Sequence, residues 1–353
     1  MRPDPKRFDE MTRRQLLRRA ALLASGALAG PALFQLIRAG DPLAIAFAQG
    51  LFDRIKGLPP EVTSNKDFYV VSKNPPGFDP VVNGERWTLE IAGLVSRPVK
   101  LAYNSIRALP SVERYHTLEC ISNEIGGNLI SNAKWRGVPL RDVLAKAGEL
   151  SPKTVRIAFR CADGYTEAIP LADALNPDSL LVYEMNGERL PDAHGFPVRL
   201  LVPGLFGMKN PKWITKIEAV NYNFLGYWER SGWSDKAVVQ TMSKFATPRS
   251  GTTVRPGDDV ELGGVAYAGD RGIRAVELSS DDGKTWQPAE IKSPLGKYTW
   301  VLWASVWKPP AAGTYPLRIR ATDGLGRRQT DEDTPTLPHG ATGHHRIVLR
   351  VRA

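Results

Sequence analysis

The chain has 353 residues, of which 42% are hydrophobic and 24% are charged. This length allows two domains with buried cores, because single domains usually hold about 100–200 residues. The composition is that of a globular protein, and it excludes a disordered chain and a multi-pass membrane protein. Of the net charge of +10, residues 1–48 carry +4, with eight Lys or Arg and four Asp or Glu. The basic residues of the remaining chain are scattered rather than gathered in blocks, which argues against a nucleic-acid partner.

The N-terminus has the pattern of an export signal. Arg13 and Arg14 precede an apolar run over residues 20–37, and residues 46–48 (Ala-Phe-Ala) offer a cleavage site. The paired arginines resemble the twin-arginine signal, which exports folded proteins. We expect residues 1–48 to be this signal and the protein to reach the periplasm or the outer face of the membrane. An uncleaved anchor is the alternative, because the run approaches the about 20 residues that span a bilayer.

Strand-like and helix-like runs are mixed in the first two hundred residues. Runs rich in β-branched and other apolar residues predict strands over Trp87–Ile91, Tyr115–Glu119, Val155–Arg160 and Val198–Val202. Two further runs predict short helices over Pro139–Gly148 and Ile169–Leu175. Because strands and helices do not alternate regularly, the pattern indicates an α+β domain rather than a parallel α/β sheet.

The composition changes to turn-forming residues between Thr247 and Gly257, and we place a domain boundary after residue 246. Short alternating runs follow and predict strands over Val260–Leu262, Ile273–Leu278, Trp300–Trp303, Leu317–Arg320 and Ile347–Arg350. Such strands, separated by turns over about a hundred residues, are typical of a β-sandwich.

One stretch of this second region, from Ser279 to Trp286, fits the S-x-D-x-G-x-T-W box of sialidase-like propellers. A propeller needs several copies at blade spacing, and the chain has one. A hairpin turn accounts for the stretch instead, with Gly283 in the left-handed region and aspartates bonding nearby amides.

The chain has two cysteines, Cys120 and Cys161. In an exported protein two cysteines form a disulfide by default, and nothing in the sequence excludes this pairing. A c-type haem needs C-x-x-C-H, which is absent, and a zinc site needs more cysteine and histidine than the chain supplies. Polar and turn-forming residues surround both cysteines, which is more typical of a binding site than of a core.

Four separated stretches share the pattern of one enzyme family. They are His116–Asn123 (HTLECISN), Asp163–Tyr165 leading to Ile169–Leu171, Tyr183–Arg199 with its HGFPVR, and Gly207–Trp213 (GMKNPKW). In order and spacing they resemble the sulfite oxidase family of molybdopterin-dependent oxidoreductases, from about Phe68 to the C-terminus. The resemblance implies a sulfite-oxidase-type molybdopterin-binding domain over residues 49–246 and an immunoglobulin-like dimerisation domain over residues 247–353.

The resemblance also implies one molybdenum–molybdopterin cofactor per chain. Cys120 matches the thiolate that binds molybdenum, and a thiolate suits so soft a site. Arg199 can hold the cofactor phosphate through two parallel hydrogen bonds, and Lys212 can add a point charge. The other positions matched to cofactor contacts are His194, Asn210, Pro211, Asp163 and, with residues that differ from the family pattern, Ser72 and Lys73. Taken alone, Arg199 could instead pair with a carboxylate, and His194 could be an ordinary loop histidine.

The substrate side departs from the family pattern. Sulfite oxidases continue the cysteine motif as C-A-G-N-R-R, and the second arginine helps to bind sulfite. This chain has Glu124 and Ile125 at the two arginine positions, and Trp233 where the family has a substrate-site tyrosine. Exchanging a cation for a carboxylate near an anion costs several kcal/mol in a partly buried site. We therefore expect Cys120, Ile125 and Trp233 to be the catalytic positions of a pocket that disfavours sulfite.

The sequence thus predicts an exported oxidoreductase that transfers an oxygen atom at molybdenum, with its substrate and direction open. Because the sequence contains neither a haem motif nor a flavin fold, electrons must pass through an external protein or a quinone-linked membrane subunit. The resemblance also implies a homodimer through the C-terminal domain. Reduction of organic sulfoxides or N-oxides is the alternative reaction. The alternative class is a non-catalytic exported protein with an immunoglobulin-like binding module, in which Cys120 pairs with Cys161.

Overall fold

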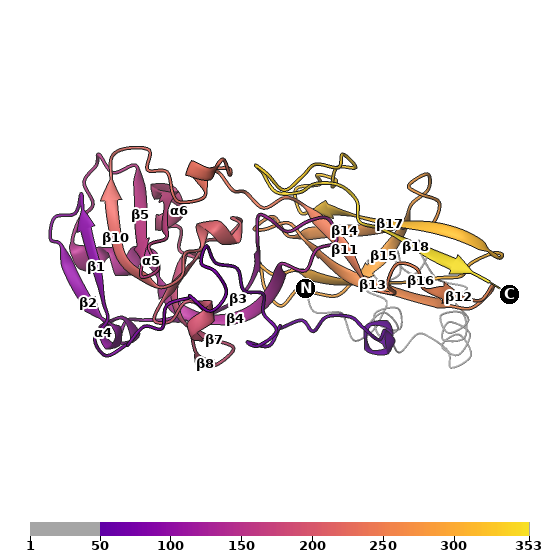
Figure 1. The fold of residues 1–353 in the computed structure, drawn as a ribbon, viewed down its shortest axis with the longest axis horizontal. Coiled ribbons are helices and arrows are strands. Elements are labelled where there is room, and N and C mark those ends of the chain that lie inside the picture. The colour runs from indigo at the N-terminus through magenta and orange to yellow at the C-terminus, as the bar shows by residue number, and fades with distance from the viewer. Residues whose placement is uncertain (1–49, 353) are drawn as a thin grey trace, which may run out of the picture.

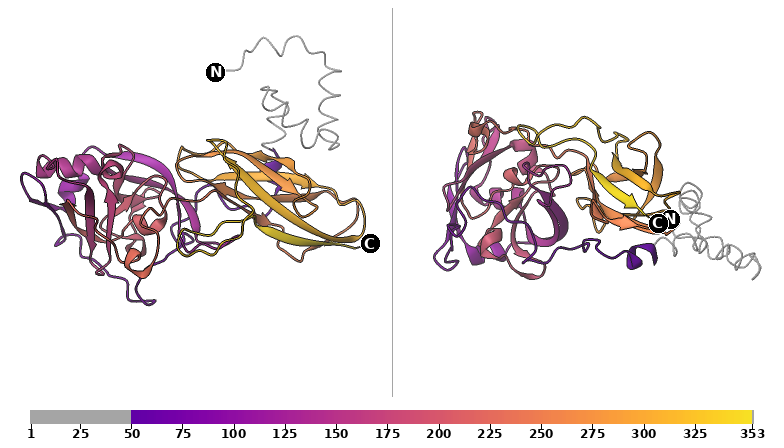
Figure 2. Two further views of the ribbon diagram at one scale, coloured as in Figure 1. Left: turned by 90° about the horizontal axis from the view of Figure 1, so that it is seen from above. Right: turned by 45° about the vertical axis from the view of Figure 1, so that its right-hand side comes forward.

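A computed structural model describes residues 50–352, and the expected signal over residues 1–48 lies outside this range. Figure 1 shows two units arranged end to end along the longest axis, and Figure 2 shows the same arrangement from two other directions. The N-terminal unit is built on two five-stranded sheets, and the C-terminal unit on one eight-stranded sheet. Within the described range, no helix has the length and apolar character needed to cross a membrane.

The first sheet of the N-terminal unit has the strand order β2-β1-β10-β5-β6. Its strands are β1 (Thr88–Gly93), β2 (Val99–Ala102), β5 (Arg156–Cys161), β6 (Thr166–Pro170) and β10 (Ile214–Val220). In β1 alternate residues point inward, so Leu89 and Ile91 enter the core. Near the middle of the sheet β5 and β10 run antiparallel, which places Cys161 beside Ile214.

The second sheet has the order β3-β4-β7-β8, and β9 also pairs with β7. Its strands are β3 (Val112–Glu119), β4 (Ile130–Pro139), β7 (Leu180–Met185), β8 (Glu188–Arg189) and β9 (Arg199–Leu201). The strands β3 and β4 form an antiparallel pair, and the loop that joins them begins with Cys120. The sheet therefore carries this cysteine at the end of a well-paired strand.

The helices of this unit are short. They are α4 (Tyr103–Arg107), α5 (Leu140–Leu144) and α6 (Leu171–Leu175), with 3-10 turns η2 (Ala145–Ala147), η3 (Asp192–His194), η4 (Gly207–Lys209) and η5 (Glu229–Ser231). Both predicted helices are present, but the first shrinks to α5 and η2 and ends at Gly148, whose φ is 77°. The unit is therefore mostly β with few helices, and the α+β prediction overestimated its helix content.

Six strands of this unit were not predicted from the sequence, namely β2, β4, β6, β7, β8 and β10. In β4 and β10 polar residues interrupt the apolar ones, so neither period is regular in the sequence. In β4, for example, Asn132 is fully buried because its side-chain oxygen accepts the Thr117 hydroxyl at 3.0 Å. A partner that is distant in sequence makes such a residue acceptable in a core strand.

The C-terminal unit is one curled sheet with the order β11-β13-β16-β15-β14-β17-β18-β12. Its strands are β11 (Met242–Thr247), β12 (Thr253–Val254), β13 (Val260–Tyr267), β14 (Ile273–Ser279), β15 (Gln287–Ile291), β16 (Val301–Trp307), β17 (Gly313–Asp323) and β18 (Arg346–Val351). All five strands predicted here are present. The sheet is continuous because β15 pairs with both β14 and β16, where the sequence predicted two separate layers.

The stretch from Ser279 to Trp286 forms the hairpin turn between β14 and β15, as predicted. Asp281 accepts hydrogen bonds from the Thr285 amide at 2.9 Å and from the Thr285 hydroxyl at 2.6 Å. Gly283 has a φ of 91°, in the left-handed region. These local bonds account for the motif without a propeller.

The end of β3 is held by the C-terminal unit. The Thr117 amide donates to the Tyr298 carbonyl, and the Thr117 carbonyl accepts the Tyr267 hydroxyl, both at 2.9 Å. The Thr117 hydroxyl accepts the Trp300 amide at the same distance. The strand that leads to Cys120 is therefore positioned by both units.

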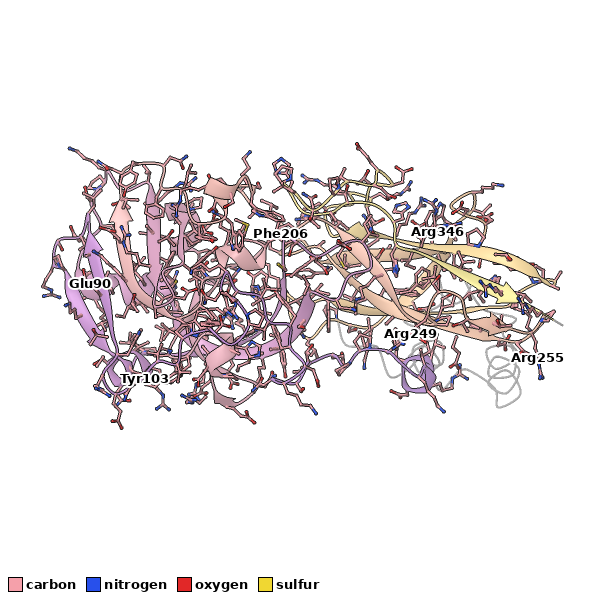
Figure 3. All side chains as sticks on the ribbon, viewed as in Figure 1. Glu90, Tyr103, Phe206, Arg249, Arg255 and Arg346 are labelled. Carbon is pink, nitrogen blue, oxygen red and sulfur yellow. The ribbon has the colours of Figure 1, made fainter. Side chains whose placement is uncertain are left out.

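A buried apolar cluster closes the same junction. Figure 3 labels Phe206, which lies between the two units. The cluster joins it to Leu51, Phe52, Ile55, Ile121, Ile130, Met208, Ala237, Val239, Val265, Tyr267, Trp300, Leu302 and Ala304. Because these residues come from both units and from the first described segment, their burial ties the units together.

We predict that Thr117→Val destabilises the protein. Valine has nearly the same shape, but it leaves the buried Trp300 amide without an acceptor, which costs about 1–3 kcal/mol. Denaturant titration should show the free energy of unfolding falling by this amount at an unchanged m-value. Thr314→Val, at an exposed position of β17, is the matched control and should change this free energy by less than about 0.5 kcal/mol. An unchanged midpoint for Thr117→Val would contradict the role given to this bond.

Candidate active site

A cavity of about 260 Å³ opens beside Cys120 in the N-terminal unit. Its walls come from segments far apart in the sequence, between residues 68 and 233. The structure brings together every residue that the sequence proposed for the site except Ile125. The gathered residues are Ser72, Lys73, Cys120, Asp163, His194, Arg199, Asn210, Pro211, Lys212 and Trp233.

Cys120 lies directly after β3, where its amide donates to the Leu129 carbonyl at 2.9 Å. Its sulfur lies 3.0 Å from the Ser122 hydroxyl oxygen. Cys120 and Cys161 are both buried free thiols, so the disulfide alternative is wrong. Burial raises the pKa of the Cys120 thiol, although the Ser122 hydrogen bond opposes the shift. A thiolate at this position therefore needs a further cation, such as a metal ion, to stabilise it.

Arg199 is a buried cation that has no carboxylate partner within residues 50–352. Its terminal nitrogens donate to the carbonyls of His194 and Asn210, both at 3.2 Å. Its Nε finds no hydrogen-bond acceptor among the described residues. Burial lowers the pKa of Arg199 to about 10. A buried guanidinium with an open N–H is a site that an anion would complete.

Lys212 adds a second positive charge to the same wall. Burial, followed by repulsion from Arg199, lowers the pKa of Lys212 to about 8. Its ammonium donates to the Ala193 carbonyl at 2.9 Å. An anion held between the two cations would offset both unfavourable effects. The wall is therefore suited to a phosphate group.

His194 and Asn210 are already bonded within the protein. The Nε2 atom of His194 lies 2.8 Å from the Asn65 carbonyl oxygen, and burial lowers the pKa of this histidine to about 4. The Asn210 side chain donates to the Phe206 carbonyl at 2.9 Å and accepts the Val202 amide at 2.7 Å. At neutral pH His194 is thus uncharged, and Asn210 shapes the site through its main chain.

The remaining predicted contacts, Ser72, Lys73 and Asp163, meet around Asn74. The side chain of Asn74 donates to Asp163 at 3.4 Å and accepts from Lys73 at 2.9 Å. The Lys73 ammonium also lies 5.6 Å from the centre of the Tyr227 ring. Polar groups gathered at one part of a largely apolar pocket are typical of a site for a heterocyclic ligand.

Another part of the lining is apolar. It is formed by Val70, Val71, Ile121, Met208, Trp228 and Trp233. Ile125, expected in the substrate pocket, does not line the cavity and packs instead against Gly343 of the C-terminal unit. Glu124 is exposed and is also absent from the lining. The expectation that Ile125 lies in the pocket is therefore corrected.

Sequence reasoning did not propose twelve of the lining residues. They are Phe68, Tyr69, Val70, Val71, Leu118, Ile121, Ser122, Tyr165, Gly207, Met208, Trp213 and Trp228. Most of them adjoin proposed residues or lie within the family motifs, and this adjacency was an available signal. Tyr69 and Val70 carry no such signal, because an extended segment enters a site only through tertiary packing.

The loop between β3 and β4 is fixed from two sides. Within the loop, the Asn123 side chain donates to Glu119 and accepts from the Leu129 amide, both at 2.9 Å. From the C-terminal unit, the Lys244 ammonium donates to the Gly127 carbonyl at 2.6 Å. The segment that follows Cys120 is therefore held in one conformation by side chains of both units.

Two family models match the chain. Residues 77–228 match the oxidoreductase molybdopterin binding domain, and residues 236–334 match the Mo-co oxidoreductase dimerisation domain. The fold and the site therefore define a molybdopterin-dependent oxidoreductase. A sulfite oxidase of Arabidopsis thaliana is 30% identical over 328 residues, covering 76% of this chain and 83% of that protein. The chain belongs to the sulfite oxidase family.

Two further comparisons mark the extent of this likeness. The mitochondrial sulfite oxidase of Drosophila melanogaster is 32% identical over 290 residues, which cover 69% of this chain and 50% of that protein. The chain thus spans about half the length of this relative. The crystal structure of the sulfane dehydrogenase SoxCD from Paracoccus pantotrophus has a TM-score of 0.68 at 22% identity, over 78% of this chain and 80% of that one. This structural likeness shows the fold.

The residues of the cavity fit the molybdenum–molybdopterin cofactor that the family implies. The buried Cys120 thiol lacks a cation, and the buried Arg199 lacks an anion. Within residues 50–352 no group of three or more His, Cys, Asp or Glu side chains is placed to hold a metal ion. Cys120 would therefore be the protein ligand of the metal, and Arg199 and Lys212 would hold the phosphate.

We predict that Arg199→Gln weakens cofactor retention about 10- to 100-fold. The substitution removes charge-assisted hydrogen bonds to the phosphate, each of which contributes about 1.5–3 kcal/mol. Pterin released from the purified, folded protein is the measurement. Arg160→Gln is the control, because Arg160 is an exposed cation on β5 that pairs with Glu218. Full pterin content in folded Arg199→Gln would contradict the assignment.

Proposed function

We propose that this protein is an exported molybdenum-cofactor oxidoreductase that transfers an oxygen atom between water and a small neutral or weakly charged substrate. Oxidation joins the oxygen of water to the substrate and releases two protons and two electrons, and reduction is the reverse. The electrons pass to or from a separate carrier protein. The apolar lining beside Cys120 is the observation that carries the proposal.

Among the described residues of this pocket, no cation is left to pair with a sulfite anion. Among the described residues, the cations that line the cavity are Lys73, Arg199 and Lys212, and we assign all three to the cofactor. A sulfite anion facing Trp228 and Trp233 would lose its hydration without gaining a charge partner. An organic sulfoxide, a sulfide or an amine N-oxide is desolvated at lower cost, so the pocket favours these substrates.

Each part of the chain then has a defined task. The bound cofactor supplies the two-electron oxygen-atom transfer. Cys120 holds the metal, while Arg199 and Lys212 hold the phosphate. Trp228 and Trp233 exclude water and pack against the apolar groups of the substrate. Neutral His194 completes the cofactor wall without adding charge.

Export and partners form part of the proposal. The twin-arginine pattern in residues 1–48 supports export of a protein that has already folded around its cofactor. The match to a dimerisation domain supports a homodimer through the curled sheet, which we assign to the family's immunoglobulin-like domain. The non-catalytic alternative required a Cys120–Cys161 disulfide, and the free thiols and the family membership oppose it.

We predict about one molybdenum per chain in protein from a molybdenum-replete host, and loss of the molybdenum–thiolate absorption band in Cys120→Ser. A serine hydroxyl replaces the soft thiolate, so the metal loses its protein ligand. Elemental analysis and the visible absorption spectrum of the folded proteins provide the measurements. Cys161→Ser is the matched control, because Cys161 is also a buried free thiol but does not line the cavity. An unchanged absorption band in Cys120→Ser would refute the assignment.

We predict that kcat/KM for sulfite is at least about 30-fold lower than for the best sulfoxide, sulfide or N-oxide. The missing cation should cost about 2–4 kcal/mol of transition-state binding, which corresponds to about 30- to 1,000-fold. Steady-state assays with an artificial electron donor and an artificial acceptor measure both directions. Efficient sulfite turnover at low concentration would overturn the substrate assignment.

A further inference from the structure

A buried group of ionisable side chains lies next to the cavity and has no part in the cofactor site. Its members are Glu167 on β6, Lys209 in η4, Glu229 in η5 and Asp235 in the segment that follows. The side chains of Lys209 and Glu167 are 0% exposed, whereas 31% of the Asp235 side chain is exposed. We call these four residues the carboxylate cluster; it runs from the core to the surface.

Lys209 is the centre of the carboxylate cluster. Its Nζ lies 2.7 Å from Glu167 Oε1 and 3.3 Å from Asp235 Oδ1, and it also contacts Glu229 Oε1. Arg156 also donates to Asp235 Oδ1, at 2.8 Å. Three carboxylates therefore face two cations. One added proton makes the set neutral, which favours a proton bound inside it.

A tyrosine connects the cluster to the cavity. Tyr165 lines the cavity, and its hydroxyl lies 3.0 Å from Glu167 Oε2 and 2.9 Å from the Met208 carbonyl. Hydrogen-bonding groups thus follow one another from the cavity to solvent, in the order Tyr165, Glu167, Glu229 with Lys209, and Asp235.

The Glu167 and Glu229 side chains are near enough that hydrogen bonding between them contributes to raising the pKa of Glu167. A Cβ added at Gly226 would meet Glu229 Oε2 at 2.4 Å and Glu167 Oε1 at 2.9 Å, so only glycine leaves room for both carboxyls. Among the described residues, Glu229 Oε2 is buried and has no hydrogen-bond partner. An oxygen in this state is open to a proton, because a buried acceptor without a donor is unfavourable.

Electrostatics support a proton on Glu167 at neutral pH. Burial, and then repulsion from Glu229, raises the pKa of Glu167 to about 8, although Lys209 opposes the shift. Hydrogen bonding to Arg156 lowers the pKa of Asp235, so a proton that arrives there is released readily. The ionisable groups that surround Glu167 are Tyr165, Cys161, Arg156, Lys209, Glu229 and Asp235.

We propose that the carboxylate cluster carries the protons of the reaction between the cavity and solvent, with Tyr165 and Glu167 as the cavity end and Asp235 as the exit. This inference rests on the proposed function, because oxygen transfer from water releases two protons for every two electrons that reach the carrier. In reduction the same groups deliver two protons to the cavity. Glu229 and Lys209 hold the shared proton between these ends.

The sign of the pH dependence follows from the direction of the reaction. In oxidation Glu167 must accept a proton, so kcat rises as the pH rises through about 8, the pKa of Glu167. In reduction Glu167 must donate a proton, so kcat falls across the same range. We call this rise or fall of kcat the limb near pH 8. If the cluster had a structural role alone, substitutions in it would change the stability of the protein, and the wild-type profile of kcat against pH would show no such limb.

The first test measures kcat against pH in the cofactor-loaded protein. Glu167→Gln and Tyr165→Phe should each lose the limb near pH 8 and lower kcat at least about 10-fold, at unchanged molybdenum content. Glu290→Gln is the matched control, because Glu290 is a buried carboxyl of β15 whose pKa burial raises to about 7. Its profile should equal that of the wild type. An unchanged profile in Glu167→Gln or Tyr165→Phe overturns the proposal.

Infrared titration of the full cofactor-free chain gives a second readout that needs no turnover. The wild type should lose a protonated-carboxyl band between about pH 7 and 9. The component of this band that titrates near pH 8 should be absent from Glu167→Gln and present in Glu290→Gln, which lacks only the component near pH 7; a component near pH 8 that persists in Glu167→Gln overturns the proposal. A wild type that shows the band but turns over no substrate would refute the oxygen-transfer function and not the proton site.

If Glu167→Gln does not fold, Asp235→Asn tests the same proton path at its other end. Asp235→Asn removes the acceptor at the partly exposed end, and it should lower kcat and flatten the limb near pH 8. A wild-type profile in Asp235→Asn overturns the assignment of the exit.

Discussion

The hydrogen bonds around Thr117 are the constraint on which the rest of the site depends. Its amide, carbonyl and hydroxyl each bond to a different residue of the C-terminal unit, at the end of the strand that leads to Cys120. Because a strand end is otherwise free to fray, Cys120, the proposed metal ligand, would move without this docking. The C-terminal unit is thus part of the scaffold of a cavity to which it contributes no lining residue.

The interior of the N-terminal unit contains two separate groups of buried charges, and in each group one sign is in excess. On the cofactor side, Arg199 and Lys212 are cations with depressed pKa values, and within residues 50–352 neither forms an ion pair with a carboxylate. On the other side, Lys209 is surrounded by carboxylates that outnumber the nearby cations. Each imbalance is unfavourable in the isolated chain and is relieved by a specific addition, an anion in one case and a proton in the other.

The sequence predicted the strands with regular alternation and ten of the residues that line the cavity, most of which lie in short motifs with fixed spacing. It could not predict β4, whose buried Asn132 depends on a partner in β3. It also placed Ile125 by its distance from Cys120, but the loop turns this side chain towards Gly343. The cluster around Lys209 joins residues 167 and 235, and only the folded chain shows that they meet. Spacing along the chain predicts local chemistry, whereas long-range pairing decides what enters the core.

The loop after Cys120, tied down by Asn123 from within and by Lys244 from the other unit, has a consequence for selectivity. A wall that is already ordered requires little conformational entropy when a ligand arrives, so recognition does not depend on closure of a lid over the substrate. The pocket then selects substrates by size, since a molecule that is too wide cannot displace the ordered residues of the wall. Such a pocket should accept a family of similarly sized molecules at comparable rates and reject larger homologues abruptly, as a sieve does.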